Sequence, residues 1–343
     1  MSAGPKLRIA VVGCGAFGRN HARVYRQLEQ ERAAVQLVGV VDIDSVRADK
    51  VAKEFATAAF GSLNELEGKI DAASIAVPTV DHLSVGAQLM RAGVDVLIEK
   101  PIAASLAEAD ELIAIAAQTQ RIAQAGHLER FNPAVRATIP LVTQPMFFEV
   151  HRLSVFTPRS LDVDVVMDLM IHDLDVVLSL VKARVCEIRA VGLPVISDKV
   201  DIANVRIEFE TGCIANFTAS RVSTEKVRKL RFFQPHQYIS IDYGRQDVIS
   251  IRVDEGAAAA LIRGEMPAEP QGPAPGIAAE KPKVEAQEPL RAEIQAFISA
   301  AQTRQAPLVS LQDGRNALGL ALEINARIAE HHQRAGVAAM YKT

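Results

Sequence analysis

The sequence predicts an α/β domain on a doubly wound parallel sheet, followed by an α+β domain on a large, open and mainly antiparallel sheet. Two observations lead to this prediction. In the first 125 residues short apolar runs alternate with segments of helical spacing, whereas beyond about residue 145 strand-like runs follow one another with one long helical segment among them. Alternation of strand and helix is typical of parallel sheets, and successive strands joined by turns are typical of antiparallel ones.

The strands expected in the first domain are apolar throughout, because both faces of such a sheet are covered. They are Leu7–Val12, Gln36–Asp42, Ala72–Val77 and Val94–Glu99. The helices expected between and after them are Phe17–Glu31, Ser45–Phe55, Asp81–Ala92 and Ser105–Gln120.

The second domain is expected to contain one helix, Val165–Val181, and a hairpin turn at Thr211-Gly212. Its expected strands are Met146–Val155, Ile188–Val195, Ile202–Glu210, Cys213–Arg221, Lys229–Gln234, Tyr238–Asp242 and Asp247–Val253. A segment rich in Pro and Gly near 256–289 is predicted to be a long loop, and Leu290–Ala301 and Asp313–Ala335 return to helical spacing. We therefore expect domains at 1–125 and 126–289, with C-terminal helices at 290–335 packing back on the core.

Composition narrows the class of protein. The 343 residues are 49% apolar and 23% charged, with a formal net charge of −3, so no positive field favours nucleic acid. No segment approaches the roughly 20 apolar residues of a membrane span. The three widely spaced cysteines form neither a disulfide framework nor a metal knuckle. With no export signal expected at the N-terminus, these features predict a cytoplasmic protein without nucleic-acid or membrane partners.

A glycine-rich turn follows the first strand. The run Gly13-Cys14-Gly15-Ala16-Phe17-Gly18 matches G-x-G-x-x-G between an expected strand and an expected helix. In that context Gly13 permits the tight turn, Gly15 lets a pyrophosphate approach the backbone, and Gly18 lets the helix pack close to the strand. The turn, including Ala16 and Phe17 at the helix N-terminus, predicts a Rossmann dinucleotide site.

The second strand ends at Asp42, where the adenosine ribose of a dinucleotide is read. A carboxylate there accepts hydrogen bonds from the ribose hydroxyls and repels a 2′-phosphate. We therefore expect NAD, with NADP less favoured. Arg47 is the nearest cation that would favour NADP.

A lysine, Lys100, follows the apolar strand that ends at Glu99. Ligands bind at this carboxyl edge of doubly wound sheets. An apolar environment lowers the pKa of a lysine and makes it a usable proton acceptor, and Pro101 restrains the turn. The alternative is a surface lysine paired with Glu99.

Asp168 and His172 lie four residues apart in the expected helix, with Asp175 three residues further on the same side, whereas Asp173 points elsewhere. A carboxylate beside an imidazole orients the ring and raises its basicity, as proton transfer requires. Two alternatives stay open: a surface helix contact, or an Asp–His–Asp metal site, for which no further His or Cys cluster supplies ligands.

Taken together, these motifs resemble the Gfo/Idh/MocA family of NAD(P)-dependent sugar and inositol oxidoreductases. The resemblance covers nearly the whole chain and includes the glycine turn with His21 after it. Its other motifs are Ile75-Ala76-Val77-Pro78-Thr79 with His82, Glu99-Lys100-Pro101, Gly126-His127-Leu128-Glu129-Arg130-Phe131-Asn132-Pro133, Asp168 with His172, and Leu311-Gln312-Asp313-Gly314-Arg315-Asn316-Ala317-Leu318.

The resemblance implies roles for individual residues. Lys100 would be the catalytic acid/base, His172 a second proton-handling group, and Asp168 the group that orients substrate or His172. Glu99 and Thr79 would lie by the nicotinamide ribose. The implied cofactor contacts also include Pro78, His82 and Lys100, and the implied substrate contacts are His127, Arg130, Asn132, Asp168, His172 and Asp175. No metal is implied. Met170 stands where the family often has glycine, which leaves the local start of the helix open.

The run from Gly126 to Pro133 is similar to the branch that acts on UDP-linked N-acetylhexosamines. Arg130, whose guanidinium suits phosphate or carboxylate, would then face the substrate, although it could instead cap a crossover between domains. The resemblance implies oxidation of the 3-hydroxyl of UDP-N-acetylglucosamine, with the keto sugar passing to an aminotransferase for amino-sugar, lipid A or polysaccharide synthesis. Another sugar or inositol dehydrogenase, an NAD-dependent glycosidase and a non-catalytic sugar or nucleotide sensor remain alternatives. A homodimer or homotetramer through the open sheet is also expected.

Overall fold

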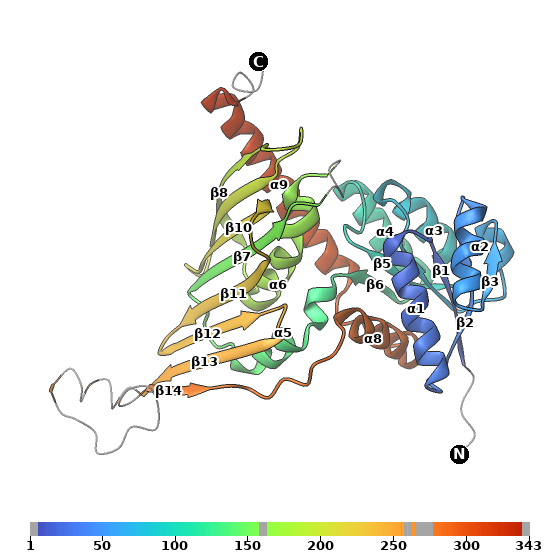
Figure 1. Ribbon diagram of the computed structural model, residues 1–343, viewed down its shortest axis with the longest axis horizontal. Helices are drawn as coiled ribbons and strands as arrows, with labels where there is room; N and C mark the ends of the chain where they lie inside the picture. Colours follow the sequence, from blue (N-terminus) through green and yellow to red (C-terminus); the bar gives the residue numbers. More distant parts are fainter. Residues whose placement is uncertain are drawn as a thin grey trace. The chain divides into compact units, whose positions relative to one another are not determined.

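The computed structural model describes residues 6–157, 163–254 and 277–337, together with 256, 259, 263 and 264. The chain forms two compact units. Unit 1 comprises residues 1–131 and 288–318, and unit 2 comprises residues 132–287 and 319–343. This division differs from the three predicted segments, because residues 290–335 are shared between the units and the first border lies at 131 instead of 125. Figure 1 labels most of the helices and strands of both units.

Unit 1 is built on a six-stranded parallel sheet with the order β3-β2-β1-β4-β5-β6. Its strands are β1 (Leu7–Val12), β2 (Val35–Val41), β3 (Ala58–Phe60), β4 (Ala72–Ile75), β5 (Asp95–Glu99) and β6 (Ala123–Gly126). The chain leaves β1 toward β2 on one side and returns to β4 on the other, so the sheet is doubly wound. The predicted fold class is confirmed. The short edge strands β3 and β6 were not predicted.

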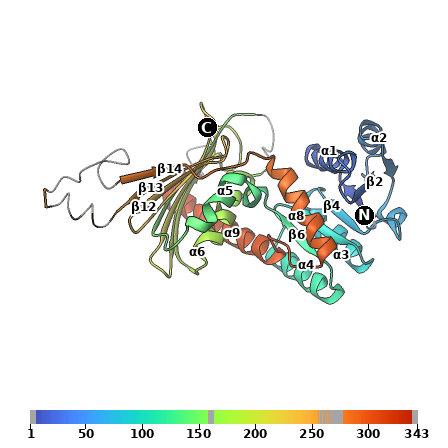
Figure 2. The same cartoon turned by 90° about the horizontal axis from the view of Figure 1, so that it is seen from below.

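Helices cover both faces of this sheet (Figure 2). They are α1 (Ala16–Gln30), α2 (Ser45–Glu54), α3 (His82–Arg91), α4 (Leu106–Thr119) and α8 (Pro289–Thr303). The apolar side chains of α1 and α8 share one buried core with β1 and β2, which includes Tyr25, Leu28 and Phe297. Arg291 of α8 also forms an ion pair with Glu31, with 2.9 Å between Arg291 Nη1 and Glu31 Oε1. The late helix α8 therefore completes the unit that the N-terminal residues begin.

Unit 2 is built on an eight-stranded sheet with the order β14-β13-β12-β11-β7-β10-β9-β8. All neighbouring strands pair antiparallel except β7 and β10, which run parallel. The strands are β7 (Phe147–Val155), β8 (Val185–Leu193), β9 (Ile202–Phe209), β10 (Ile214–Ser223), β11 (Val227–Gln234), β12 (Gln237–Asp242), β13 (Asp247–Val253) and β14 (Ile277–Glu280). The predicted turn at Thr211-Gly212 joins β9 to β10, with Gly212 at φ +78°. This mainly antiparallel sheet confirms the second part of the predicted fold class.

Buried and exposed residues alternate along these strands, as expected for a sheet with one covered face. In β9, for example, Ala203, Val205, Ile207 and Phe209 are buried, and the residues between them are exposed. The covered face packs against α5 (Pro133–Thr138), α6 (Ile171–Val181) and the part of α9 (Leu311–Ala335) that belongs to unit 2 (Figure 2).

The predicted helix Val165–Val181 needs a correction at its start. Residues Val166–Met170 form a π-helical turn, and the regular α-helix α6 begins only at Ile171. A π turn holds more residues than an α turn, and four residues still advance close to one full turn, so the expectation that Asp168 and His172 share a face stays a prediction. Met170, the residue where the family often has glycine, is the last residue of this turn.

About half of the predicted loop 256–289 lies outside the described residues. The part that is described corrects the prediction, because Ile277–Glu280 forms β14 and pairs antiparallel with β13. No helix among residues 6–157, 163–254 and 277–337 combines the length and apolar character needed to cross a membrane.

Candidate active site

The glycine-rich turn has the close contacts that its sequence predicts. Gly13 adopts φ +93°, and a Cβ atom there would lie 2.5 Å from the carbonyl oxygen of Ala76. A Cβ atom on Gly18 would lie 1.7 Å from the carbonyl oxygen of Gly13. Neither position can hold a side chain without moving the backbone, so both glycines are required by the turn itself.

Gly15 differs from its two neighbours in the motif. A Cβ atom at Gly15 would meet no atom within 4 Å, so packing within the protein does not account for the missing side chain. Helix α1 starts at the next residue, Ala16, and no side chain caps its N-terminus. The N–H groups and partial positive charge of a helix N-terminus suit phosphate oxygens. This open, uncapped turn fits the pyrophosphate of a dinucleotide.

Asp42 lies beside this turn at the end of β2. Its Oδ2 accepts a hydrogen bond from the N–H of Cys14 at 2.7 Å, and its Oδ1 accepts one from the N–H of Asp44 at 2.9 Å. The guanidinium of Arg47 lies 3.4 Å from Asp42 and 3.3 Å from Asp44. Because two carboxylates share Arg47, its charge is partly neutralised. The carboxylate is thus fixed next to the turn, as reading of an adenosine ribose requires.

Cys14, within the turn, is not a candidate nucleophile. Burial, and then the negative charge of Asp42, raise the pKa of its thiol to about 12. The thiol therefore stays protonated at neutral pH.

The other predicted cofactor residues also lie at the carboxyl ends of strands. Pro78 and Thr79 follow β4, Glu99 ends β5, and the half-buried Lys100 comes next, joined to Pro101 by a cis peptide bond. Carboxyl ends of parallel strands meet at one edge of a sheet, so these residues share the edge that holds the glycine turn.

His82 is anchored by the protein itself. Its Nδ1 lies 2.9 Å from the carbonyl oxygen of Pro101, and its Nε2 lies 3.0 Å from that of Val77. The side chain is buried, with 1% exposed. His82 thus links the turn after β4 to the turn that holds Lys100, a relationship that the sequence did not reveal.

Glu99 is hydrogen-bonded to His21 inside unit 1. His21 Nε2 lies 2.8 Å from Glu99 Oε1, and the other oxygen, Oε2, accepts a hydrogen bond from the N–H of Lys100 at 3.3 Å. In the sequence His21 belonged to a family motif but had no predicted role. Its position three residues after Gly18, on the face of α1 that meets the sheet, is the signal that could have found it.

His127 and Arg130 follow β6 in unit 1, with His127 buried and Arg130 half-buried. Asn132, in unit 2, caps α5: its Oδ1 accepts from the N–H of Ala134 at 3.1 Å, and its Nδ2 donates to the carbonyl oxygen of Tyr243 at 3.1 Å. This capping role was not predicted, and a substrate contact of Asn132 stays a prediction.

The predicted groups on the second domain all belong to unit 2. Asp168 lies in the π turn, His172 is half-buried at the start of α6, and Asp175 is buried. Between them Asp173 forms a buried, bidentate ion pair with Arg152 of β7, with distances of 2.6 Å and 2.9 Å. Asp173 was expected only to point away from the site, and its structural role was missed.

One cluster of possible metal ligands occurs among the described residues, formed by His21, Glu99 and Glu293, whose ligand atoms lie within 4.8 Å of one another. Both ring nitrogens of His21 already lie at hydrogen-bonding distance from protein groups, Nε2 from Glu99 and Nδ1 from Ser74. A hydrogen-bonded network accounts for the cluster without an ion.

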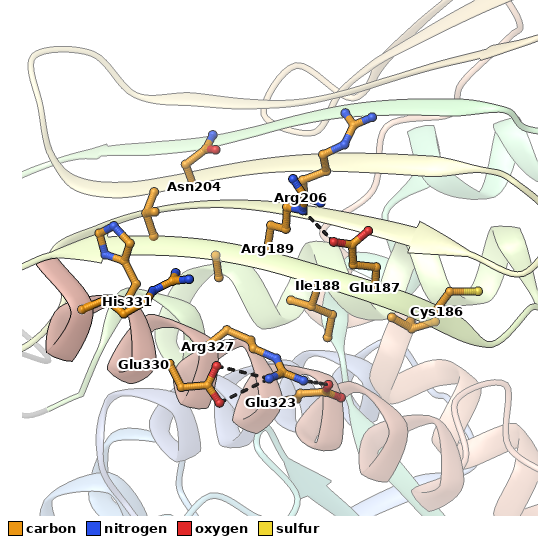
Figure 3. A pocket seen from close by; sticks show the side chains of 14 residues that line it. Cys186, Glu187, Ile188, Arg189, Asn204, Arg206, Glu323, Arg327, Glu330 and His331 are labelled. Atoms are coloured by element: carbon orange, nitrogen blue, oxygen red, sulfur yellow. Dashed lines mark hydrogen bonds and ion pairs between the residues drawn. The ribbon is translucent and has the colours of Figure 1, made fainter.

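Unit 2 also contains a cavity of about 720 Å³ between β8, β9 and α9 (Figure 3). None of the predicted site residues lines it. Its charged side chains pair largely with one another: Arg189 with Glu187, and Arg327 with Glu323 and Glu330. This cavity therefore offers a poor match to the predicted chemistry.

A doubly wound parallel sheet with an open glycine turn beside an acidic residue, here Asp42, is typical of NAD-dependent oxidoreductases. Comparisons with known proteins agree with this class. Residues 7–127 match the family model for the NAD-binding Rossmann fold of the GFO_IDH_MocA oxidoreductases, and residues 144–238 match the GFO/IDH/MocA C-terminal domain. The chain belongs to the Gfo/Idh/MocA family. The predicted family, enzyme class and NAD cofactor are confirmed.

Three relatives illustrate the range of the similarity. UDP-N-acetylglucosamine 3-dehydrogenase of Acidithiobacillus ferrooxidans is 35% identical over 329 residues, covering 96% of this chain and 99% of that protein. Its solved structure, named GnnA, matches with a TM-score of 0.84 at 34% identity over 94% of this chain and 97% of that one. The scyllo-inositol 2-dehydrogenase (NAD(+)) of Bacillus subtilis is 28% identical over 236 residues, 64% of this chain and 68% of that protein. The myo-inositol 2-dehydrogenase structure from Lactobacillus plantarum, 18% identical with a TM-score of 0.76 over 95% of this chain and 98% of that one, shares the fold.

Proposed function

We propose that this protein oxidises the 3-hydroxyl of UDP-N-acetylglucosamine to a ketone, with NAD as the oxidant. The similarity to UDP-N-acetylglucosamine 3-dehydrogenase, which extends over 96% of this chain, carries the proposal. The motif from Gly126 to Pro133 supports it, since its Arg130 offers a guanidinium suited to phosphate oxygens. The keto sugar would then be a substrate for an aminotransferase.

In this proposal the bound nicotinamide supplies the hydride acceptor, and the protein supplies binding and proton transfer. Lys100, as a neutral amine, takes the proton of the substrate hydroxyl while the carbon loses hydride and becomes a ketone. Lys100 releases this proton before the next turnover, and His172 is the second proton-handling group. Asp168 orients His172 or the substrate. Gly15 and the N-terminus of α1 bind the pyrophosphate, and Asp42 binds the adenosine ribose. A positioned acid/base of this kind contributes about 10²–10⁴-fold to the rate.

Mass spectrometry of the products tests the proposal directly. Purified protein is mixed with NAD and UDP-N-acetylglucosamine, and a sugar nucleotide two hydrogens lighter is expected. Product mass is preferable to NADH absorbance because an unfavourable equilibrium could hide slow accumulation. The same reaction after EDTA treatment should give the same product. If NAD binds but no lighter product forms, UDP-N-acetylglucosamine is not the substrate, and free sugars and inositols become the substrates to test. Cleaved glycoside without net NADH would instead indicate a glycosidase.

We also propose that the protein is a homodimer or homotetramer in the cytoplasm. The face of the unit 2 sheet opposite its helices carries an aromatic row, in which the ring centroids of Phe147 and Phe233 lie 5.8 Å apart and those of Phe233 and Tyr238 5.0 Å apart. Phe233 is 38% exposed. Burial of this row against a second copy would remove apolar surface from water. All three cysteines are free thiols, which suits a reducing compartment. Light scattering of Phe233→Asp should report a smaller particle than wild type. An unchanged mass would exclude this face.

A further inference from the structure

A chain of buried hydrogen bonds leads from helix α1 to the residue before Lys100. The hydroxyl of Tyr25 lies 2.8 Å from Ser74 Oγ, and Ser74 Oγ lies 3.0 Å from His21 Nδ1. His21 Nε2 then lies 2.8 Å from Glu99 Oε1. Tyr25, Ser74 and His21 are fully buried, and Glu99 is 7% exposed. The chain thus joins α1, β4 and β5 through polar side chains inside an apolar core.

The carboxylate of Glu99 has little freedom to move. Gly126 of β6 lies against it, since a Cβ atom on Gly126 would be 2.9 Å from Glu99 Cα and 3.3 Å from Glu99 Oε2. One oxygen faces His21, and the other accepts the N–H of Lys100. The side chain is therefore fixed on three sides, by a ring nitrogen, by the backbone of Lys100 and by the neighbouring strand.

Burial alone would raise the pKa of the Glu99 carboxyl, because a charge is costly in an apolar interior. The hydrogen bond and charge of His21, together with Lys100, outweigh burial and hold this pKa below its ordinary value. The other charged group that faces the pair is Glu293 of α8, whose carboxylate lies within 4.8 Å of both. A carboxylate disfavours the charged form of a neighbouring carboxylate. The hydrogen bond from His21 is therefore more important for keeping Glu99 charged than it would be without Glu293.

We propose that His21 is a positioning residue for Lys100: its Nε2–H keeps Glu99 a carboxylate in one place, and Glu99 fixes the backbone and the charge beside Lys100. This inference rests on the acid/base role proposed for Lys100. Without its donor, Glu99 would take up a proton, and the turn that presents Lys100 would lose both an ordered hydrogen bond and a negative charge. In metal sites, groups that hold the ligands through hydrogen bonds typically affect activity by about 10–100-fold, and we expect an effect of that order for His21.

A double-mutant cycle separates this role from a merely structural one. His21→Leu and Glu99→Gln are each expected to lower kcat by about 10–100-fold, and the double variant should be no slower than the slower single one. His21→Gln, whose amide can donate to Glu99, should recover most of the lost activity. Ala22→Gly is the matched control, because it loosens the same turn of α1 and leaves the hydrogen bonds intact. Losses that add in the double variant, or an equal loss in Ala22→Gly, would overturn the inference.

An infrared measurement needs no substrate. His21→Leu at neutral pH should show the carbonyl stretch of a protonated, buried carboxyl, and the band should vanish in the double variant with Glu99→Gln. Its absence from a folded His21→Leu would also refute the inference. If His21→Leu does not fold, Ser74→Ala removes only the hydroxyl next to His21 and should give a smaller loss of kcat in the same direction. Unchanged turnover in Lys100→Ala would instead refute the proposed mechanism, and the infrared result would still stand on its own.

Discussion

His82 of α3 joins two turns at the cofactor edge of the sheet: its Nδ1 lies 2.9 Å from the carbonyl oxygen of Pro101, the residue after Lys100. Its other ring nitrogen reaches the carbonyl oxygen of Val77 at 3.0 Å. Lys100 is thus flanked by two residues that buried histidines hold, Glu99 by His21 and Pro101 by His82. Both contacts restrain backbone or carboxylate atoms on either side of the lysine.

Replacement of His82 by leucine should loosen the turns on both sides. A neutral ring has one N–H and can donate to only one of the two carbonyl oxygens. Loss of that hydrogen bond, which contributes about 0.5–1.5 kcal/mol, leaves a buried carbonyl unpaired at a cost of about 1–3 kcal/mol, so the free energy of unfolding should fall by about 1–3 kcal/mol. Urea unfolding followed by circular dichroism measures this change, since the chain has no tryptophan for fluorescence. Ser84→Ala, an exposed change in the same helix, should leave the transition in place.

The stabilisation by His82 should depend on pH. Burial lowers the pKa of His82 below 6.5 and outweighs its hydrogen bonds to Val77 and Pro101 and the charge of Glu99. The folded protein therefore binds this proton less readily than the unfolded chain, so the contribution of His82 is present above about pH 6.5 and is lost as the pH falls below it. The stability difference between wild type and His82→Leu should shrink between pH 7.5 and pH 5.5. A difference that grows toward acid pH would contradict the neutral state of the ring.

Lys100→Ala should separate binding from chemistry. The alanine variant keeps the glycine turn and Asp42, so its Kd for NAD should stay close to that of wild type. Turnover of the sugar nucleotide should fall by about 10²–10⁴-fold, because proton transfer is lost. Calorimetric titration of NAD and product quantification measure the two effects. A parallel loss of NAD binding would mean that Lys100 holds the cofactor and does not transfer the proton.

Asp42 should set the preference for NAD over NADP. Asp42→Ala removes the acceptor for the ribose and frees Arg47 from one of its two carboxylates. Hydrogen bonds to charged groups contribute about 1.5–3 kcal/mol, so kcat/KM with NAD should fall roughly 10–150-fold, and the ratio of NADP to NAD activity should rise. Asp44→Ala is the control, since it also removes one carboxylate from Arg47 but keeps Asp42, the acceptor for the ribose. It should cost stability through loss of the α2 cap, and kcat/KM with NAD should stay close to that of wild type.

The sequence contained the parts of the site that lie close together in the chain. The glycine turn, Asp42 and the Glu99-Lys100-Pro101 run follow directly from strand ends, because a parallel sheet brings such ends to one edge. The hydrogen-bond partners of these residues could not be predicted from the sequence, because His21 and Glu99 are 78 residues apart and His82 and Pro101 are 19 apart. No local pattern specifies such pairs. The π turn before α6 was missed for a related reason, since a 3.6-residue period assumes the regular helix that the turn interrupts.

Arg152 and Asp173 form a second pair that sequence spacing did not reveal, and it lies within unit 2. Their side chains are 3% and 2% exposed, and the Arg152 guanidinium also lies 5.3 Å from the ring centre of Tyr243. A pair of this kind ties β7 to α6, and therefore to the helix that holds His172.

Removal of one partner should be costly, because it leaves the other charge buried. Arg152→Met should destabilise the protein by about 3–5 kcal/mol, and the double replacement Arg152→Met with Asp173→Leu should recover most of that loss, since two apolar side chains can fill the same space. Arg231→Met is the matched control on the neighbouring strand. Arg231 lies 3.9 Å from Glu149, both side chains are about 40% exposed, and such surface pairs contribute about 0–1 kcal/mol. Urea midpoints by circular dichroism compare the four proteins. An Arg152→Met midpoint no lower than that of Arg231→Met would show that the buried pair does not hold α6 to the sheet.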